Sequence, residues 1–89
     1  MKTTIKGTTI TVNIHNDREK RMIRIIETCI DSAINSPKSE CSQREMQAAN
    51  EYASALSVLE ITDKNIGFLW AGGKCMYYYN AQWYEVEKV

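Results

Sequence analysis

The side chains most suited to catalysis in this chain are one histidine and three cysteines. His15, with Asp17 nearby, could act as a base, and Cys29, Cys41 or Cys75 could act as a nucleophile. The spacing brings the histidine close to none of the cysteines. Cys29 also lies within a series of isoleucines, where a thiol packs as a small apolar group. We therefore predict no catalytic residue and a chain that is not an enzyme.

The same residues have the number, but not the spacing, of a zinc site. Structural zinc is normally held by close pairs of ligands, such as two cysteines separated by two to four residues, and the gaps here are much longer. Gly72-Gly73-Lys74 lacks the spacing of a phosphate-binding loop. Glu85 and Glu87 stand in a polar segment that gives no reason for a raised pKa. The sequence predicts neither a metal nor a cofactor.

Aromatic residues are concentrated in the last third of the chain, with seven of the eight between Phe68 and Tyr84. Tyrosine and tryptophan offer a large contact area at a small entropic cost and dominate interface hot spots. A small sheet also needs bulky side chains for its core, so part of this set is structural. We predict that the remainder binds a partner: Leu69, Met76, Tyr78 and Trp83.

A second candidate surface is a polar but uncharged stripe with helical spacing, which contains Gln43, Gln47 and Asn50 and continues to Ser54. Such side chains can read base edges, with Arg44 and Lys38 on phosphates. However, the stripe is flanked by carboxylates that would repel a phosphate backbone, namely Glu40, Glu45, Glu51 and Glu60. The stripe could equally bind a protein or line a dimer.

Charge and composition constrain the class of protein. The formal net charge is zero, whereas residues 1–24 carry six basic and two acidic residues, a local balance of +4. A dedicated DNA-binding domain normally has a clear basic excess overall. Three cysteines without paired spacing, no signal-like N-terminus and no long apolar segment predict a cytoplasmic protein that does not bind membranes. The length predicts one domain over residues 1–89, with self-association as a homodimer.

The first half of the chain predicts a strand followed by a helical hairpin. Ile10, Val12 and Ile14 alternate with polar residues, as in a half-buried strand. A turn at Lys6-Gly7 or a bulge at Gly7 brings Ile5 onto the same face. Asn16 or Asp17 can cap a helix that stops before Pro37, and Asn16 with Glu19 approximates a capping box. Its apolar face contains Met22, Ile23, Ile25, Ile26, Cys29, Ile30, Ala33 and Ile34.

After a polar loop over residues 38–41, Ser42 with Glu45 has the spacing of a capping box for a second helix. One face of this helix is apolar, and its alanines permit close packing against the first helix. That face contains Met46, Ala49, Tyr52, Ala53 and Leu56.

The last third predicts three antiparallel strands over residues 66–71, 74–79 and 83–89, joined by turns at Gly72-Gly73 and within Asn80-Ala81-Gln82. The faces given next assume a two-residue turn at Ala81-Gln82, whereas a three-residue turn would exchange the two faces of the last strand. One face covers the helices: Ile66, Phe68, Trp70, Cys75, Tyr77, Tyr79, Tyr84 and Val86. We expect the N-terminal strand to join this sheet, because an isolated hairpin is rarely stable. The predicted fold class is α+β, a two-layer sandwich with an N-terminal β strand or hairpin, a helical hairpin and a C-terminal three-stranded antiparallel meander.

These features predict a small non-enzymatic interaction protein that binds and modulates or inhibits a protein partner. Proteins of this kind are common among accessory and anti-defence proteins of phages and mobile elements, and that general observation, not a residue, suggests such a role here. One alternative is a DNA-binding transcriptional regulator with a winged-helix-like arrangement of the second helix. Another is a small-ligand protein whose aromatic rings stack on a nucleotide.

Overall fold

The N-terminal alternation forms a hairpin of its own. The computed structural model describes residues 1–62 and 65–88, beginning with β1 (Lys2–Thr4) antiparallel to β2 (Thr11–Asn13). The Ile5 N–H donates to the Ile10 carbonyl at 3.0 Å, which places both buried isoleucines on one face. The predicted hairpin is confirmed, with a turn that contains Gly7 at a φ of 81°.

The prediction that this segment joins the C-terminal sheet is wrong, because β1 and β2 form a separate two-stranded sheet. Its turn, and not its strands, bonds to the C-terminal segment. The Thr9 N–H donates to the Tyr77 hydroxyl at 3.2 Å, and the Glu87 N–H donates to the Gly7 carbonyl at 2.9 Å. On the other side, β2 is held by the Asn13 N–H, which donates to the Ile61 carbonyl at 2.8 Å. Packing against the rest of the fold therefore stabilises a hairpin that would be marginal alone.

The first helix, α1 (Asp17–Asn35), begins and ends where the sequence predicts. The Asn16 side chain accepts a hydrogen bond from the Glu19 N–H at 3.0 Å, as an N-cap does. The Glu19 carboxylate accepts from the His15 N–H at 2.9 Å, which lowers the pKa of Glu19 below its ordinary value of 4.5. Most of the predicted apolar face packs inward, but Ile25 is 38% exposed and lies at its border.

The second helix, α2 (Ser39–Val58), starts earlier than predicted, and the capping box at Ser42 and Glu45 is wrong. Ser42 is fully buried, and its hydroxyl donates to the Ala33 carbonyl at 2.7 Å. That carbonyl would normally bond the N–H four residues later, but Pro37 has none. The proline that ends α1 therefore leaves an acceptor that Ser42 satisfies from the other helix.

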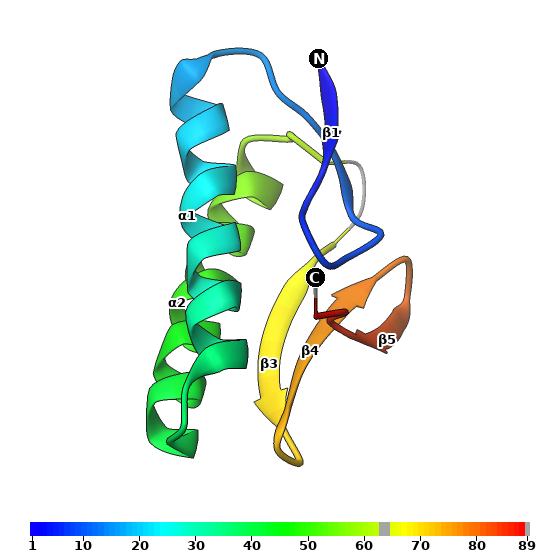
Figure 1. Ribbon diagram of the computed structural model, residues 1–89. Coiled ribbons are helices and arrows are strands. Elements are labelled where there is room, and N and C mark those ends of the chain that lie inside the picture. The colour runs from blue at the N-terminus through cyan, green and yellow to red at the C-terminus, as the bar shows by residue number, and fades with distance from the viewer. Residues whose placement is uncertain (63–64, 89) are drawn as a thin grey trace.

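The two helices form the predicted antiparallel hairpin (Figure 1). Met46, Ala49, Ala53 and Leu56 of α2 are fully buried, whereas Tyr52, predicted on the same face, is 37% exposed. The helix ends with the Ile61 N–H donating to the Leu56 carbonyl at 3.1 Å. Glu60 between them has a φ of 56°, the left-handed geometry of a Schellman-type C-terminus.

The C-terminal segment is the predicted meander: β3 (Gly67–Ala71), β4 (Lys74–Tyr79) and β5 (Gln82–Glu85), in that order. The Gly72-Gly73 turn is confirmed. The second turn lies at Asn80-Ala81, one residue before the predicted Ala81-Gln82, because Tyr79 pairs with Gln82. This changes the strand register by two residues, which leaves every side chain on its predicted face.

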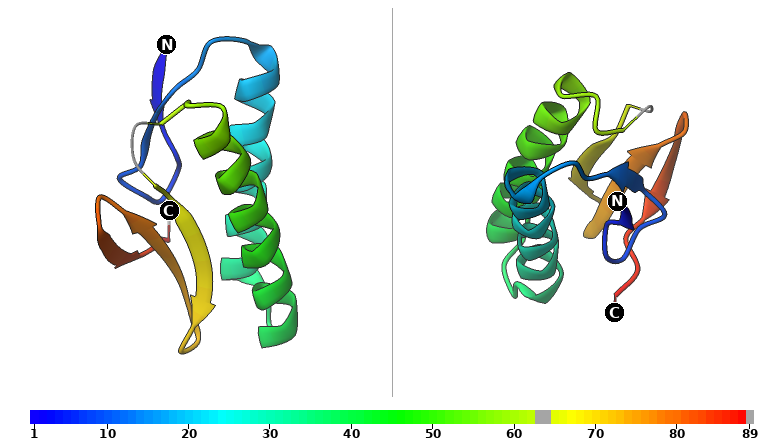
Figure 2. Two further views of the ribbon diagram at one scale, coloured as in Figure 1. Left: turned by 180° about the vertical axis from the view of Figure 1, so that it is seen from behind. Right: turned by 90° about the horizontal axis from the view of Figure 1, so that it is seen from above.

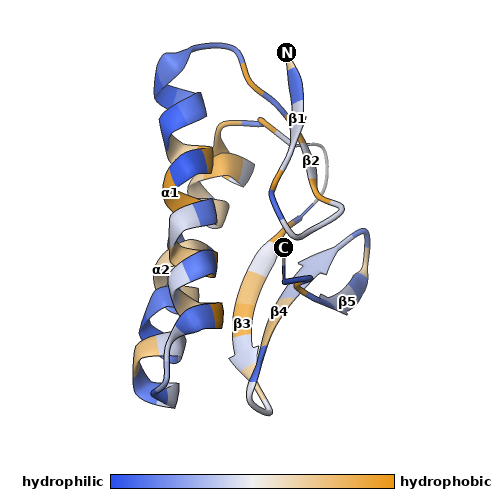
Figure 3. Cartoon of the chain, in the orientation of Figure 1, coloured by the Kyte–Doolittle hydropathy of each residue, from blue (hydrophilic) through white to orange (hydrophobic). Residues whose placement is uncertain are grey.

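Helices and meander form two layers, with the hairpin beside them at one end (Figure 2). The strand β3 lies next to α2 and is apolar over most of its length (Figure 3). One buried cluster links all parts, with Ile5 from the hairpin, Ile26 from α1, Leu56 from α2 and Phe68 from β3. Within residues 1–62 and 65–88, no helix is long and apolar enough to cross a membrane.

The contact between the hairpin turn and the C-terminal segment generates a stability prediction. A Cβ atom on Gly7 would lie 2.7 Å from the Glu87 carbonyl oxygen, whereas one on Gly73 would meet nothing within 4 Å. The φ angles of the two glycines are nearly equal, 81° and 79°. We expect Gly73→Ala to lower the free energy of unfolding by about 1 kcal/mol, and Gly7→Ala by a further 1–3 kcal/mol, roughly, from overpacking. Urea denaturation of both variants measures the difference, and equal losses would show that the contact yields easily.

Candidate functional site

The face of the meander that points away from the helices carries the aromatic surplus predicted from the sequence. The register places Leu69 opposite Met76 and Tyr78 opposite Trp83. Because side chains alternate along each strand, these residues share one face, and Phe68, Cys75 and Tyr77 occupy the other and are buried. The division of residues between the two faces was therefore predicted correctly.

Two of these side chains are unusually exposed for their size. Leu69 is 48% exposed and Trp83 is 52% exposed, whereas Met76 and Tyr78 are half-buried. The rings of Tyr78 and Trp83 meet edge to face, with centroids 5.3 Å apart and planes inclined by 61°. This contact restricts the rotation of both rings, so the free chain already limits their side-chain entropy.

The polar stripe of α2 lies beside the same sheet. A groove of about 320 Å³ runs along the boundary between α2 and β3 and is lined by residues of both elements: Gln43, Gln47, Asn50, Phe68, Leu69 and Trp70. The Asn50 side-chain oxygen accepts a hydrogen bond from the Phe68 N–H at 3.0 Å. Asn50 thus has a structural task in holding β3, while the Gln43 and Gln47 side chains are exposed.

Leu69 connects the groove beside α2 with the aromatic face of the meander. It lines the groove and also pairs with Met76 on the aromatic face. All the site residues predicted from the sequence are thereby linked through neighbours into one surface. We call this surface the interaction face and define it as Gln43, Gln47, Asn50, Leu69, Met76, Tyr78 and Trp83. The sequence placed its two parts on separate elements, and only the packing of α2 against β3 shows that they adjoin.

The interaction face contains no charged side chain, and its border on the sheet is charged. Lys74 and Glu85 lie on the same sheet face and approach each other to 3.9 Å, with both side chains more than half exposed. An exposed pair of this kind adds little stability. A surface with an uncharged centre and a polar rim has the composition typical of protein interfaces.

Phe68 and Trp70 line the groove but were predicted only as cover for the helices. Both are on the helix-facing side of β3, where Phe68 is buried and Trp70 is half-buried. Their place on an edge strand could have indicated this role, because residues of an edge strand also contact whatever packs alongside that edge. Nothing in the sequence states that β3 is the strand beside α2.

The candidate catalytic residues lie elsewhere and are not assembled. The ring Nδ1 of His15 lies 2.9 Å from the Glu19 carboxylate at the start of α1. Burial raises the pKa of the Cys29 thiol, and the neighbouring Glu45 carboxylate adds to the effect. Burial likewise raises the pKa of Cys75, with a contribution from Glu85. Thiols of raised pKa are weak nucleophiles at neutral pH.

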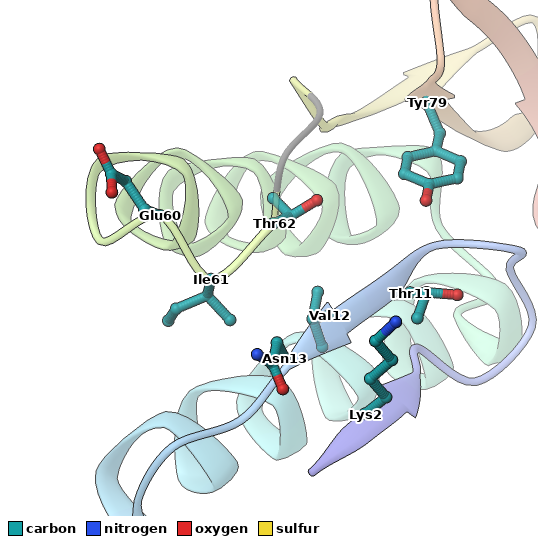
Figure 4. Close-up of a pocket in the computed structure, with 8 residues that line it drawn as sticks. All are labelled: Lys2, Thr11, Val12, Asn13, Glu60, Ile61, Thr62 and Tyr79. Carbon is teal, nitrogen blue, oxygen red and sulfur yellow. The ribbon is translucent and has the colours of Figure 1, made fainter.

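No group of three or more His, Cys, Asp or Glu side chains in the part of the chain that the structure describes could hold a metal ion. A different cavity, of about 400 Å³, lies between the hairpin, the end of α2 and the end of β4. Figure 4 shows the Tyr79 ring pointing from β4 towards the hairpin, with Lys2 on the opposite wall. Its lining mixes a cation, a carboxylate and hydroxyls over an apolar floor: Lys2, Thr11, Val12, Asn13, Glu60, Ile61, Thr62 and Tyr79.

The cavity at Lys2 and Tyr79 has the volume of a small-ligand site. Its polar groups point from several directions without forming an evident cradle for one ligand: the Asn13 side chain lies 3.5 Å from the N-terminal amine, and the Lys2 and Glu60 side chains are exposed. The small-ligand alternative predicts stacking on aromatic rings, and this cavity, with Tyr79 in its wall, is a second candidate place for such a ligand.

Comparison with known proteins assigns no family. No protein-family profile matches the chain, and neither the curated proteins nor the solved structures yield a significant match.

The thiol environments generate a reactivity prediction. We expect Cys29 and Cys75 to react with iodoacetamide more slowly in the folded protein at neutral pH than in urea, because their raised pKa values leave less thiolate in the folded state. Peptide mass spectrometry at increasing reaction times gives the rate at each cysteine separately. Faster labelling of either thiol in the folded chain than in the unfolded chain would contradict the prediction and restore that cysteine as a candidate nucleophile.

Two residues of the groove, Asn50 and Gln47, are predicted to differ in their effect on stability. Asn50→Ala removes the acceptor of the Phe68 N–H, and we expect it to lower the free energy of unfolding by about 1–3 kcal/mol. Gln47→Ala, one helical turn earlier and exposed, is the control and should change stability by less than about 0.5 kcal/mol. Urea denaturation measures both variants. A stable Asn50→Ala variant would show that β3 needs no anchor on α2.

Proposed function

We propose that this chain is a non-enzymatic interaction protein that binds and modulates a protein partner through the interaction face. The observation that carries the proposal is the continuity of this face, from the exposed amides of α2 across Leu69 and Met76 to the Tyr78–Trp83 ring pair. Leu69 and Trp83 are about half exposed, so their apolar side chains are in contact with water. Binding to a protein would remove this apolar area from water.

The chemistry of the face favours a protein over a nucleic acid. Tyrosine and tryptophan are the residues most enriched among protein hot spots. An uncharged face gives no phosphate contacts, which dominate affinity for DNA. The α2 stripe is also not a free helix face, since β3 lies alongside it and Asn50 is engaged with the Phe68 N–H. DNA recognition through α2 is therefore the alternative, with less support.

The absence of enzymatic activity remains part of the proposal. It is supported by the raised pKa values of Cys29 and Cys75 and by the position of His15, which is paired with Glu19. A protein without chemistry of its own regulates or inhibits by covering a surface of its target, as phage and mobile-element accessory proteins do. The free cysteines fit a reducing compartment such as the cytoplasm. Self-association as a homodimer belongs to the same proposal.

A double substitution tests the face. Tyr78→Ala with Trp83→Ala removes the ring pair, and we expect partner binding to weaken by about 2 kcal/mol or more for each true hot spot. The matched control is Val58→Ala with Leu59→Ala, which removes apolar side chains that are 81% and 50% exposed at the end of α2, outside the interaction face. Circular dichroism establishes that both variants are folded, and calorimetry with the captured partner gives the affinities.

The partner is first obtained by pull-down from lysate with and without nuclease. A stoichiometric protein that survives nuclease and is lost only with the Tyr78→Ala and Trp83→Ala variant supports the proposal. Unchanged binding of that variant contradicts it. Enrichment that depends on nucleic acid supports the DNA-binding alternative, and a melting-temperature shift with one member of a nucleotide panel supports the small-ligand alternative.

A further inference from the structure

The outer edge of β5 carries backbone groups without a partner in the described chain. The Val86 N–H donates to the Cys75 carbonyl at 2.8 Å and so points towards β4. The Glu87 N–H donates to the Gly7 carbonyl and so points the opposite way. Because these directions alternate along a strand, the N–H and C=O groups of Trp83 and Glu85 point outwards with Glu87. Figure 1 shows that β5 is the strand farthest from the helices, so neither helix covers this edge.

The opposite edge of the sheet is treated differently. The outward N–H of Phe68 on β3 is taken by Asn50, and α2 lies alongside. Natural sheets protect open edges with very short strands, charged side chains, prolines or bulges. The strand β5 has four residues and one charge, at Glu85, but neither a lysine nor a proline, so its outward main-chain groups are only partly protected. This strand is therefore suited to pairing with another strand.

We propose that β5 pairs antiparallel with β5 of a second copy of this chain, which joins the two meanders into one continuous sheet. The two-fold axis lies at Tyr84, so that Trp83 of each copy lies opposite Glu85 of the other. Both residues have outward-pointing groups, and such a pair exchanges two hydrogen bonds. The two pairs related by the axis use every outward donor of the two strands.

The N-terminal hairpin sets this register. A pairing centred on Glu85 would place Trp83 opposite the second copy's Glu87, whose N–H is already bonded to Gly7. A pairing centred on Trp83 would place Glu85 opposite the second copy's Ala81, which lies in the turn at a φ of 64° and cannot continue a strand. Only the register at Tyr84 matches the free groups of both copies.

The self-complementary register favours a second copy over a foreign strand, and charge does not oppose it. The formal net charge of zero means that two copies do not repel each other at long range. The register places each Glu85 carboxylate opposite a tryptophan and not opposite the other carboxylate, and Lys74 lies beside it within its own chain. Pairing also brings the Trp83 side chains of the two copies close together, so that the interaction faces form one larger surface.

Proline substitution tests the proposal. Glu85→Pro removes an outward N–H and no hydrogen bond within the chain, and proline is tolerated in an edge strand at such a position. Glu85→Ala is the matched control, since it removes the carboxylate and keeps the N–H. Light scattering from micromolar to millimolar concentration should give twice the chain mass of 10.2 kDa for the native protein and for Glu85→Ala, and the single mass for Glu85→Pro. A monomeric native protein, or a dimeric Glu85→Pro variant, overturns the proposal.

Hydrogen exchange of the native chain gives a second test that needs no variant. The Trp83 and Glu85 amides should exchange more slowly at high protein concentration, whereas the Trp70 amide, on the outer edge of β3, should not respond to concentration. Equal exchange of Trp83 and Glu85 at all concentrations overturns the proposal. This dimer specifies the self-association of the proposed function, and the two ideas can fail separately. The Tyr78→Ala and Trp83→Ala variant keeps the main chain of β5, so it should remain dimeric while it loses the partner.

Discussion

The packing of α2 between α1 and β3 is the constraint on which the rest of this molecule depends. Ala49 and Ala53 are fully buried, and their small side chains let the helix approach its neighbours closely. On one side, the Ser42 hydroxyl reaches the Ala33 carbonyl of α1, and on the other, Asn50 holds the Phe68 N–H of β3. Gly67 keeps the same boundary close, since a Cβ atom there would make a tight contact of 3.1 Å with the Asn50 oxygen.

The location of α2 decides which surfaces of the sheet remain open. Since the helices cover the face with Phe68, Cys75 and Tyr77, the opposite face has no cover within the described chain. An antiparallel sheet that packs on one face only normally carries polar side chains on its solvent-exposed face. Here Leu69, Met76, Tyr78 and Trp83 are kept, which is why this face carries the functional proposal.

Periodicity was enough to predict the elements and the side-chain faces. Alternation in residues 9–15 and the Gly72-Gly73 doublet are local signals, and a two-residue error in the register of β5 does not move a side chain to another face. The turn at Asn80-Ala81 was misplaced because Ala81 adopts a φ of 64°, which alanine rarely does, so the residue type gives no turn signal.

The errors came from contacts between distant segments. Ser42 has the spacing of a capping residue, but its role is set by Pro37 and by the proximity of Ala33, which a local pattern does not contain. The hairpin was expected to pair with the meander, but only its turn hydrogen-bonds to the C-terminal segment, through Thr9 with Tyr77 and Gly7 with Glu87. The candidate site shows the same limit: the sequence places its residues on two separate elements, and their continuity through Leu69 depends on tertiary packing.

A sheet this small has two edges and few residues with which to protect them. On the helix side, the Asn50 amide of α2 protects the edge of β3. The strands β1 and β2 pair with each other, so neither of them covers the edge of β5. The hairpin turn covers the edge at Glu87 and stops there, so the free stretch is short and has defined ends. A short free stretch limits promiscuous pairing, which long flat edges invite, and it also selects among the possible registers. The Gly7 contact therefore has two roles, since it fixes the hairpin to the fold and determines how much of β5 another strand can reach.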